Sequence, residues 1–277
     1  RHTRLLTVTG VQTCALPIFF HLEANGGGFV PPSTADFNLP PVFGNNQYTT
    51  KPILLVFLSV IVISIFFILS ARKAATVPSR LQFAGESIYG FVRDGLAKEI
   101  IGHDFMKFVP LLFSLFTFIL TNNVFGIVPL LQFPSMSHVA FPYVLALFPF
   151  IVFHWVGIRK QGLVKYLKGI AFMPGVPAFA YVLLTPIEIA TYFITRPLTL
   201  SLRLFANMFA GHLLLLVFIM GGDHLIRGVI GLKLVAPFSF TLAIVMTFFE
   251  FMVQCLQAYI FTLLTALYIG GALSDEH

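Results

Sequence analysis

Long apolar runs alternate with short polar segments along most of the chain. Residues 53–70 carry no charged side chain, and Arg72 and Lys73 follow directly. A helix needs about 20 predominantly apolar residues to cross roughly 30 Å of hydrocarbon. Further runs of this character predict additional membrane spans, and together they lie at about 53–70, 108–131, 140–158, 181–220 and 234–269. The pattern therefore predicts five nominal spans.

Three of these runs depart from a simple upright helix. Residues 181–220, as one helix rising 1.5 Å per residue, would be about 60 Å long, twice the hydrocarbon thickness. This segment is either strongly tilted or folds back near Pro197, and residues 234–269 are over-long as well. Residues 140–158 form one span or a broken hairpin, because prolines within this run interrupt backbone hydrogen bonding. We expect the two long C-terminal helices to form an oblique hairpin.

Residues 78–105 show a different pattern, in which apolar and charged positions alternate. Leu81, Phe83 and Ile88 are interleaved with charges such as Arg80 and Glu86. This pattern is typical of an amphipathic helix lying along a membrane surface. A soluble partner could equally cover its polar face.

Composition supports a membrane protein and narrows the function classes. Hydrophobic residues make up 57% of the chain and charged residues 10%, with mean hydropathy +0.91. The apolar runs are too long for barrel strands, so the predicted fold class is all-α and polytopic. The net charge of +6 lies in loops and forms no basic block with interleaved aromatics, so we expect no nucleic-acid partner. Cys14 and Cys255 are too few and too distant for a disulfide framework or zinc site, and we expect no metal or cofactor.

The basic residues predict an orientation. Six Lys and Arg lie between residues 72 and 107 and four between 159 and 178, whereas the opposite side holds fewer. The positive-inside rule then places the N-terminus outside and the C-terminus in the cytoplasm. Residues 19–52 are interpreted as an extracytoplasmic tail and 53–277 as the membrane domain. Residues 1–18 resemble a translated sequencing adapter and are excluded from fold reasoning, so the true N-terminus is expected to be missing.

One cation lies in the middle of an apolar run. Arg203 interrupts the segment 198–216, and a cation at bilayer depth costs ~2.5–3.5 kcal/mol on insertion scales. Such a residue usually faces a partner or a water-filled cavity, although an arginine near a helix end can also snorkel to the headgroups. Asn207 lies one turn on along the same face, and His212 points to roughly the opposite side. One helix would thus offer polar groups in two directions.

The last run contributes a polar stripe. Glu250, Gln254 and Gln257 are spaced i, i+4 and i+7, which places them on one helical face. A carboxylate in hydrocarbon tends to be protonated more readily, and chains of Glu, His, amides and water form proton paths. The alternative is that these groups, with Glu188 and His212, only bond one helix to another. Arg203 cannot relay protons, because its guanidinium stays protonated.

These residues, in this order, resemble subunit a of the F-type ATP synthase. The resemblance is carried by PLTLSLRLFANMFAGHLL (197–214), TPIEI (185–189), LQAYIFTLLTALYIGGA (256–272) and TNNVFGIVP (121–129). It covers the chain from about residue 50 to its end. The resemblance implies a membrane stator beside a rotating ring of c subunits, in a complex that synthesises ATP, with no nucleotide site in this chain.

The resemblance also implies residue roles. Arg203 would be the stator arginine that faces the ring carboxylate. The proton path would include the residues at the family's half-channel positions: Glu188, Asn207, His212, Glu250 and Gln257. Family members differ in which helix bears the histidine and which the acid, and some carry an acid in the second span where this chain has Gly126. The implied partners are the c-subunit ring, the b subunits of the peripheral stalk and membrane lipid.

The implied mechanism has protons enter from outside, pass His212 and Glu250, and protonate a ring carboxylate that ionises again on approaching Arg203. We expect the plasma membrane of a bacterium as the location. A secondary ion transporter or antiporter with intramembrane charges is the alternative function, and a structural scaffold is a third class. The transporter would usually show inverted repeats, and the segment around Arg203 has no second copy.

Overall fold

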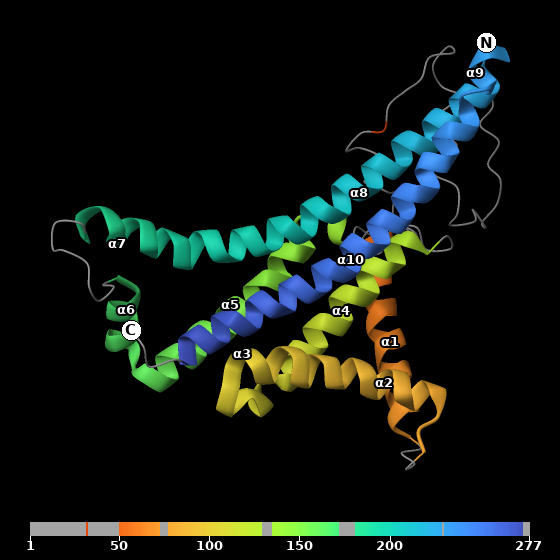
Figure 1. Ribbon diagram of the computed structural model, residues 1–277. Helices are drawn as coiled ribbons and strands as arrows, with labels where there is room; N and C mark the ends of the chain where they lie inside the picture. The colour runs from red at the N-terminus through yellow and green to blue at the C-terminus, as the bar shows by residue number, and fades with distance from the viewer. Residues whose placement is uncertain are drawn as a thin grey trace, which may run out of the picture.

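The computed structural model describes Pro32 and residues 50–72, 77–128, 135–171, 181–228 and 230–273, and every regular element within them is helical. Figure 1 shows their arrangement. The α-helices are α1 (Lys51–Ala71), α2 (Arg80–Gly90), α3 (Glu99–Ile101), α4 (Val109–Ile127), α5 (Ala140–Gln161), α6 (Leu163–Ala171), α7 (Tyr181–Ala190), α8 (Arg196–Arg227), α9 (Ile230–Lys233) and α10 (Ala236–Leu273). Short π-helical segments, η3 (Phe91–Lys98) and η7 (Thr191–Thr195), and 3-10 segments, η4 (Gly102–Lys107) and η5 (Ser135–Ser137), join them. The predicted all-α class is confirmed.

Five helices in the described part of the chain are long and apolar enough to cross a membrane. They are α1, α4, α5, α10 and one 45-residue helix from Leu183 to Arg227 that combines most of α7 with η7 and α8. The exposed side of α1 is apolar, with Phe57 and Ile61 more than half exposed. An apolar outer surface is what hydrocarbon requires of a spanning helix. The predicted polytopic membrane architecture is therefore confirmed.

The chain does not fold back near Pro197. The backbone stays helical from Tyr181 to Arg227, and Pro197 lies in the first turn of α8, directly after the π-helical η7. A π-helical turn accommodates an extra residue and frees a backbone group, which lets a proline follow without ending the helix. The α7–α8 helix is bent in Figure 1 rather than broken. Pro149 likewise lies inside an unbroken α5, so 140–158 belongs to one helix and not to a broken hairpin.

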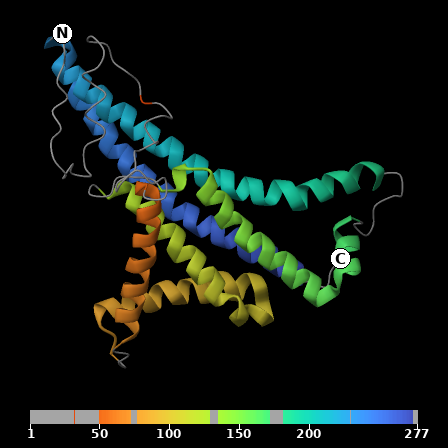
Figure 2. The same cartoon turned by 180° about the vertical axis from the view of Figure 1, so that it is seen from behind.

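The two long C-terminal helices organise the bundle. Helices α8 and α10 run side by side in opposite directions through the centre of the molecule, as both views show (Figures 1 and 2), and α10 also packs on α4 and α5. The core between them is formed by fully buried apolar side chains, among them Leu204, Met208, Ala258 and Phe261. This hairpin crosses the other spanning helices obliquely and fixes which residues of α8 face inward.

A two-faced segment crosses the end of the bundle. It begins at α2, whose N-cap Ser79 accepts a hydrogen bond from the backbone of Gln82, and continues through η3 to α3. Within η3, Val92 and Leu96 are fully buried against α4 and α10. Arg93 and Asp94 point outward, and the Arg93 side chain donates two hydrogen bonds that hold the pKa of Asp94 below its usual value. Its apolar face thus packs on the bundle and its charged face points away.

The corner between α1 and α2 allows a test of this packing. Ser70 Oγ donates to the Leu81 carbonyl, and a Cβ added at Gly85 would overlap that hydroxyl and lie 3.0 Å from Ser70 Cβ. Gly85→Ala should therefore lower the free energy of unfolding by ~1–3 kcal/mol through overpacking. Gly90→Ala, on the same helix, is the matched control, because a Cβ there meets nothing within 4 Å. Thermal unfolding in detergent measures both, and equal stability of the two variants would contradict the described corner.

Candidate functional site

Three buried polar side chains meet between α8 and α10. His212 Nδ1 lies 2.9 Å from Glu250 Oε1, and Gln254 Nε2 donates to the same oxygen at 3.0 Å. Only 4% of Glu250 and 2% of Gln254 is exposed. The three residues come from facing positions of two helices that are far apart in the sequence, so the cluster exists only because α8 and α10 pack together.

The sequence permits this close approach at two points. Glu250 and Gln254 are one turn apart on α10, so both face α8. On α8 the position facing the carboxylate is Gly211, where an added Cβ would lie 3.0 Å from Glu250 Oε1 and 3.1 Å from its Cδ. Any larger residue there would have to displace the carboxyl group. The missing side chain at Gly211 thus makes room for the acid beside His212.

The two carboxyl oxygens of Glu250 have different surroundings. Oε1 accepts from Gln254 Nε2, and when Glu250 is ionised, His212 Nδ1 donates its N–H to the same oxygen. Oε2 is buried and has no hydrogen-bond partner among the described residues. Buried oxygens without a partner are costly and readily accept a proton or a water molecule. Glu250 therefore combines one anchored oxygen with one available oxygen.

A second polar pair lies further along the same helix contact. Asn207 Nδ2 donates to Gln257 Oε1 at 2.8 Å. Gln257 is 2% exposed, whereas Asn207 is half-buried and so reaches the outer side of α8. The residues of the predicted α10 stripe are thus all buried, and each contacts a polar group of α8 or of its own helix. Together the two contacts form a line of polar groups from His212 toward the outer face at Asn207.

Arg203 lies on that outer face. Its side chain is exposed, and within the described part of the chain no carboxylate lies within 4.0 Å of it. Arg203 is one helical turn from Asn207 and on the opposite side of α8 from the buried His212. The helix therefore presents a fixed cation outward and a titratable pair inward, as the spacing predicts.

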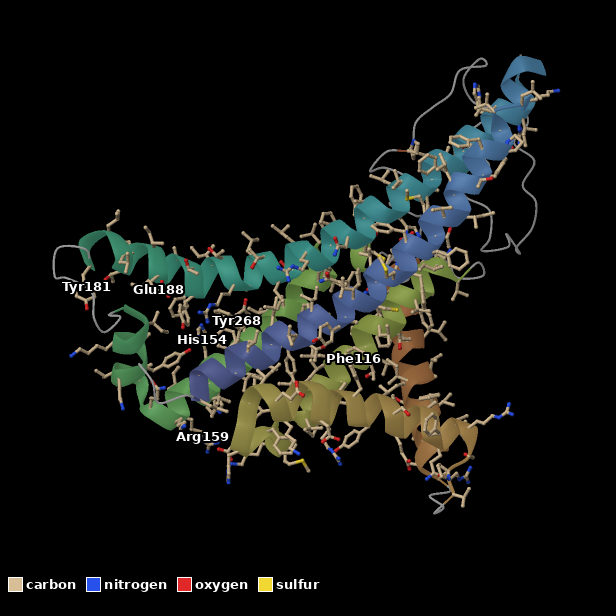
Figure 3. All side chains as sticks on the ribbon, in the orientation of Figure 1. Phe116, His154, Arg159, Tyr181, Glu188 and Tyr268 are labelled. Carbon is tan, nitrogen blue, oxygen red and sulfur yellow. The ribbon has the colours of Figure 1, made fainter. Side chains whose placement is uncertain are left out.

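The structure separates Glu188 from this cluster. Glu188 lies on α7, labelled in Figure 3, and is half-buried. It precedes His212 by 24 positions, which corresponds to about 36 Å along a continuous helix. Four of the predicted path residues, Asn207, His212, Glu250 and Gln257, are therefore brought together, and Glu188 lies near the other end of the same long helix.

Two further helices support the cluster in a way that the sequence did not specify. Asn123 Nδ2 donates to the backbone carbonyl of Gln254 at 3.1 Å, and Asn122 Nδ2 donates to Ser59 Oγ of α1 at 2.9 Å. Both asparagines are at most 1% exposed. The adjacent amides in a predicted span were a signal for such bonds, but nothing in the sequence indicated which helices they join. They tie α4 to α10 and to α1 beside the buried acid.

Within the described residues, no three His, Cys, Asp or Glu side chains gather in a way that could hold a metal ion. The pair His212 and Glu250 supplies two such groups, and its further hydrogen-bond partner is the amide of Gln254, which also lies 3.6 Å from the Met208 thioether. The arrangement suits hydrogen bonding and proton exchange within a membrane.

Known proteins share this sequence over nearly its whole length. The family model described as ATP synthase A chain matches residues 53–270. ATP synthase subunit a of Nocardioides sp. is 45% identical over 266 residues, which cover 92% of this chain and 96% of the relative. ATP synthase subunit a of Pseudarthrobacter chlorophenolicus is 48% identical over 258 residues, or 91% of this chain and 97% of the relative. The residues that build the polar cluster all lie within the matched region, and this chain belongs to the ATP synthase A chain family.

Proposed function

We propose that this chain is the proton-translocating stator subunit of a rotary ATP synthase. The observation that carries the proposal is the division of α8 into two polar sides, with Arg203 exposed on one and His212 buried against Glu250 on the other. A proton path needs titratable groups, and a stator needs a fixed charge that a moving partner can meet. Helix α8 of this family member carries both kinds of group, with His212 as the titratable one and Arg203 as the fixed charge. Neither group depends on a bound cofactor.

In this proposal the inlet path leads protons to the buried pair. A proton arriving from the outer side protonates Glu250 at Oε2, the oxygen without a partner, while Oε1 stays held by His212 and Gln254. The proton then passes along the polar line formed by Gln257 and Asn207 to the exposed side of α8. Amide side chains do not titrate, so they act by holding water and orienting donors, and His212 and Glu250 exchange the proton.

Arg203 acts on the carboxylate that arrives from another chain. Its guanidinium stays protonated, so it holds an approaching carboxylate ionised and drives its proton away. The same charge repels protons between the inlet and the outlet and thereby blocks a direct leak. Each charge crossing the membrane releases about 2.3 kcal/mol per 100 mV of potential, so several protons are needed for each ATP made elsewhere in the complex.

We further propose that Glu188 belongs to the outlet and not to the inlet. It lies on α7, near the end of the bundle where the last turn of α5 carries Arg159 and Lys160 and α6 carries Lys165 and Lys168. The positive-inside rule assigns this end to the cytoplasm and the N-terminus to the outside. The separation of Glu188 from His212 then corresponds to two half-channels offset across the membrane.

The partners follow from the two exposed polar surfaces. We propose that the c-subunit ring lies against the Arg203 face of α8, in the plasma membrane of a bacterium. The b subunits of the peripheral stalk would contact the charged face of the α2–α3 segment, where Arg93 and Asp94 are exposed. Crosslinks from this face to the b subunits are expected, and crosslinks to lipid alone would contradict the assignment.

The first test removes the exposed cation. Arg203→Ala should abolish ATP-driven acidification of inverted membrane vesicles that carry the assembled complex, because the ring carboxylate would no longer be held ionised. Arg227→Ala is the matched control, since Arg227 is paired with Asp223 at the far end of the same helix, and it should retain pumping. Unchanged pumping by Arg203→Ala would instead favour a structural scaffold. Ion transport by this chain alone in liposomes would favour a secondary transporter.

A second test moves the Glu250 carboxyl group without substituting Glu250 itself. Gly211→Ala should lower proton pumping by roughly tenfold, about 1.4 kcal/mol of barrier, because the new Cβ would crowd the Glu250 carboxyl group away from His212. Gly221→Ala on the same helix is the control, because a Cβ there meets nothing within 4 Å. Normal pumping by Gly211→Ala in an assembled complex would exclude the described geometry from the proton path.

A further inference from the structure

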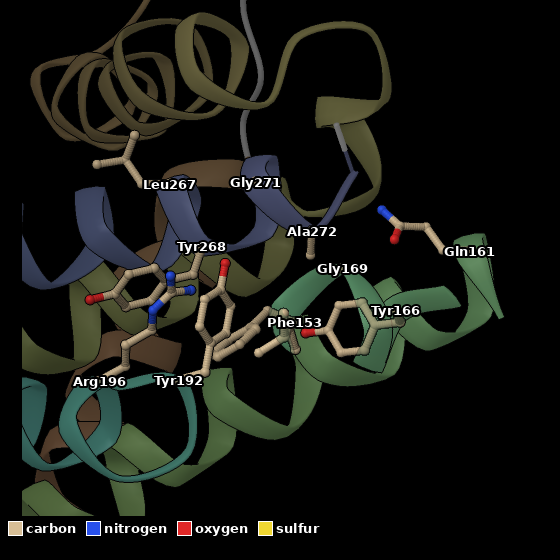
Figure 4. Close-up of a pocket in the computed structure, with 11 residues that line it drawn as sticks. Phe153, Gln161, Tyr166, Gly169, Tyr192, Arg196, Leu267, Tyr268, Gly271 and Ala272 are labelled. Carbon is tan, nitrogen blue, oxygen red and sulfur yellow. The ribbon is translucent and has the colours of Figure 1, made fainter. Parts of the chain in front are cut away.

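A cavity lies between the ends of four helices, away from the polar cluster. Its volume is about 200 Å³, and side chains of α5, α6, α10 and the η7–α8 junction line it. Figure 4 shows Arg196 reaching into it, with aromatic rings on several sides: Phe153, Tyr166, Tyr192 and Tyr268. Among the described residues, no acidic side chain contributes to the lining. The described lining therefore combines aromatic walls with the cation of Arg196.

The guanidinium group of Arg196 packs against two aromatic rings, which leaves the N–H donors at its edge available for a ligand. The guanidinium carbon of Arg196 lies 3.3 Å from the ring centroid of Tyr192 and 4.9 Å from that of Tyr268. Stacking of this kind engages the planar faces, whereas the five N–H donors of arginine point outward within the plane. Within the described part of the chain no carboxylate lies within 4.0 Å of Arg196. The side chain is thus fixed in position, and none of the described residues places an anion beside it.

The walls keep the cavity neutral apart from that charge. The hydroxyl of Tyr166 lies 2.7 Å from His154 Nδ1, and burial raises the pKa of Tyr166 to about 12, so the phenol stays uncharged. A water path for protons through this cavity is disfavoured, because none of its described lining residues carries a carboxylate and its fixed cation repels protons. An anionic ligand is favoured by the same charge.

The surroundings place the cavity at the membrane boundary. Helix α5 ends at Gln161 and α10 at Leu273, and Lys160 Nζ donates to the Leu273 carbonyl, so the two ends lie together. Helix α6 follows, with Lys165 and Lys168 interleaved among exposed apolar residues such as Val164. A short helix of this composition is typical of the headgroup layer. The cavity lies where spanning helices end and an interfacial helix begins.

The size restricts the ligand further. The cavity of about 200 Å³ is smaller than the ~300–1,000 Å³ typical of small-molecule and cofactor sites. A phosphate group with the first atoms of its ester fits this volume. Arginine binds phosphate through paired N–H donors, and basic pockets between helix ends are known sites for anionic headgroups.

We propose that this cavity binds a phosphate group, with Arg196 as its ligand, and that the phosphate belongs to an anionic phospholipid of the surrounding leaflet. Tyr192 and Tyr268 hold the guanidinium in place, and the acyl chains would extend past the exposed apolar residues of α6. Free inorganic phosphate has the same chemistry and is the alternative source. The cavity is separate from the His212–Glu250 pair, so lipid binding can be measured without reference to proton pumping.

The experiment uses the assembled complex in nanodiscs of phosphatidylcholine with a small fraction of phosphatidylglycerol. Native mass spectrometry counts the phosphatidylglycerol molecules that stay bound after release from the disc. Arg196→Gln should reduce retention of the tightest-bound phosphatidylglycerol at least tenfold, and Arg196→Lys should keep part of it. Arg159→Gln is the matched control, because it removes an exposed cation from the same end of the bundle but outside the lining.

Each outcome decides the proposal. Selective loss in Arg196→Gln, with Arg159→Gln unchanged, supports the lipid phosphate site. Release of phosphatidylglycerol by millimolar inorganic phosphate would support the phosphate chemistry and assign the site to the free ion. Equal loss in both glutamine variants would show general attraction to a basic surface and overturn the proposal, as would unchanged retention in an assembled Arg196→Gln complex.

Discussion

A carboxyl group buried in a membrane protein is the constraint on which the rest of this structure depends. Glu250 is almost fully buried, and a carboxylate in such surroundings depends on hydrogen-bond donors to offset the loss of water. His212 supplies one donor from α8 and Gln254 another from α10. The two helices must therefore lie in one register along much of their length, and α4 fixes that register through the bond from Asn123 to the Gln254 carbonyl.

The same constraint explains the small residues around the acid. Gly211 leaves room for the carboxyl group, and a Cβ at Gly126 of α4 would lie 3.2 Å from His212 Cε1 and 3.4 Å from Met208 Sδ. The imidazole of His212 packs against Gly126, so a side chain added there would compete with it for the same space. Both glycines therefore leave room for the buried pair of His212 and Glu250.

Much of this site follows from the sequence, and its limits have physical causes. Helical periodicity is enough to place Arg203 and His212 on opposite sides of α8 and to gather Glu250, Gln254 and Gln257 on one stripe, because both arguments are local. The bond between Asn122 and Ser59 could not be predicted, since it joins residues 63 positions apart whose helices must first pack. The continuity of the helix through Pro197 was also undetermined, because a π-helical turn leaves no clear composition signal.

The three arginines of α8 have different surroundings. Arg227 is paired with Asp223, and Arg196 is stacked between the rings of Tyr192 and Tyr268. Arg203 is exposed and, among the described residues, meets no carboxylate. A cation at this depth costs ~2.5–3.5 kcal/mol in hydrocarbon, so an exposed position is stable only if water or an anion covers it. The fold that buries Glu250 on one side of α8 therefore leaves on the other side a charge that no carboxylate of the described residues compensates.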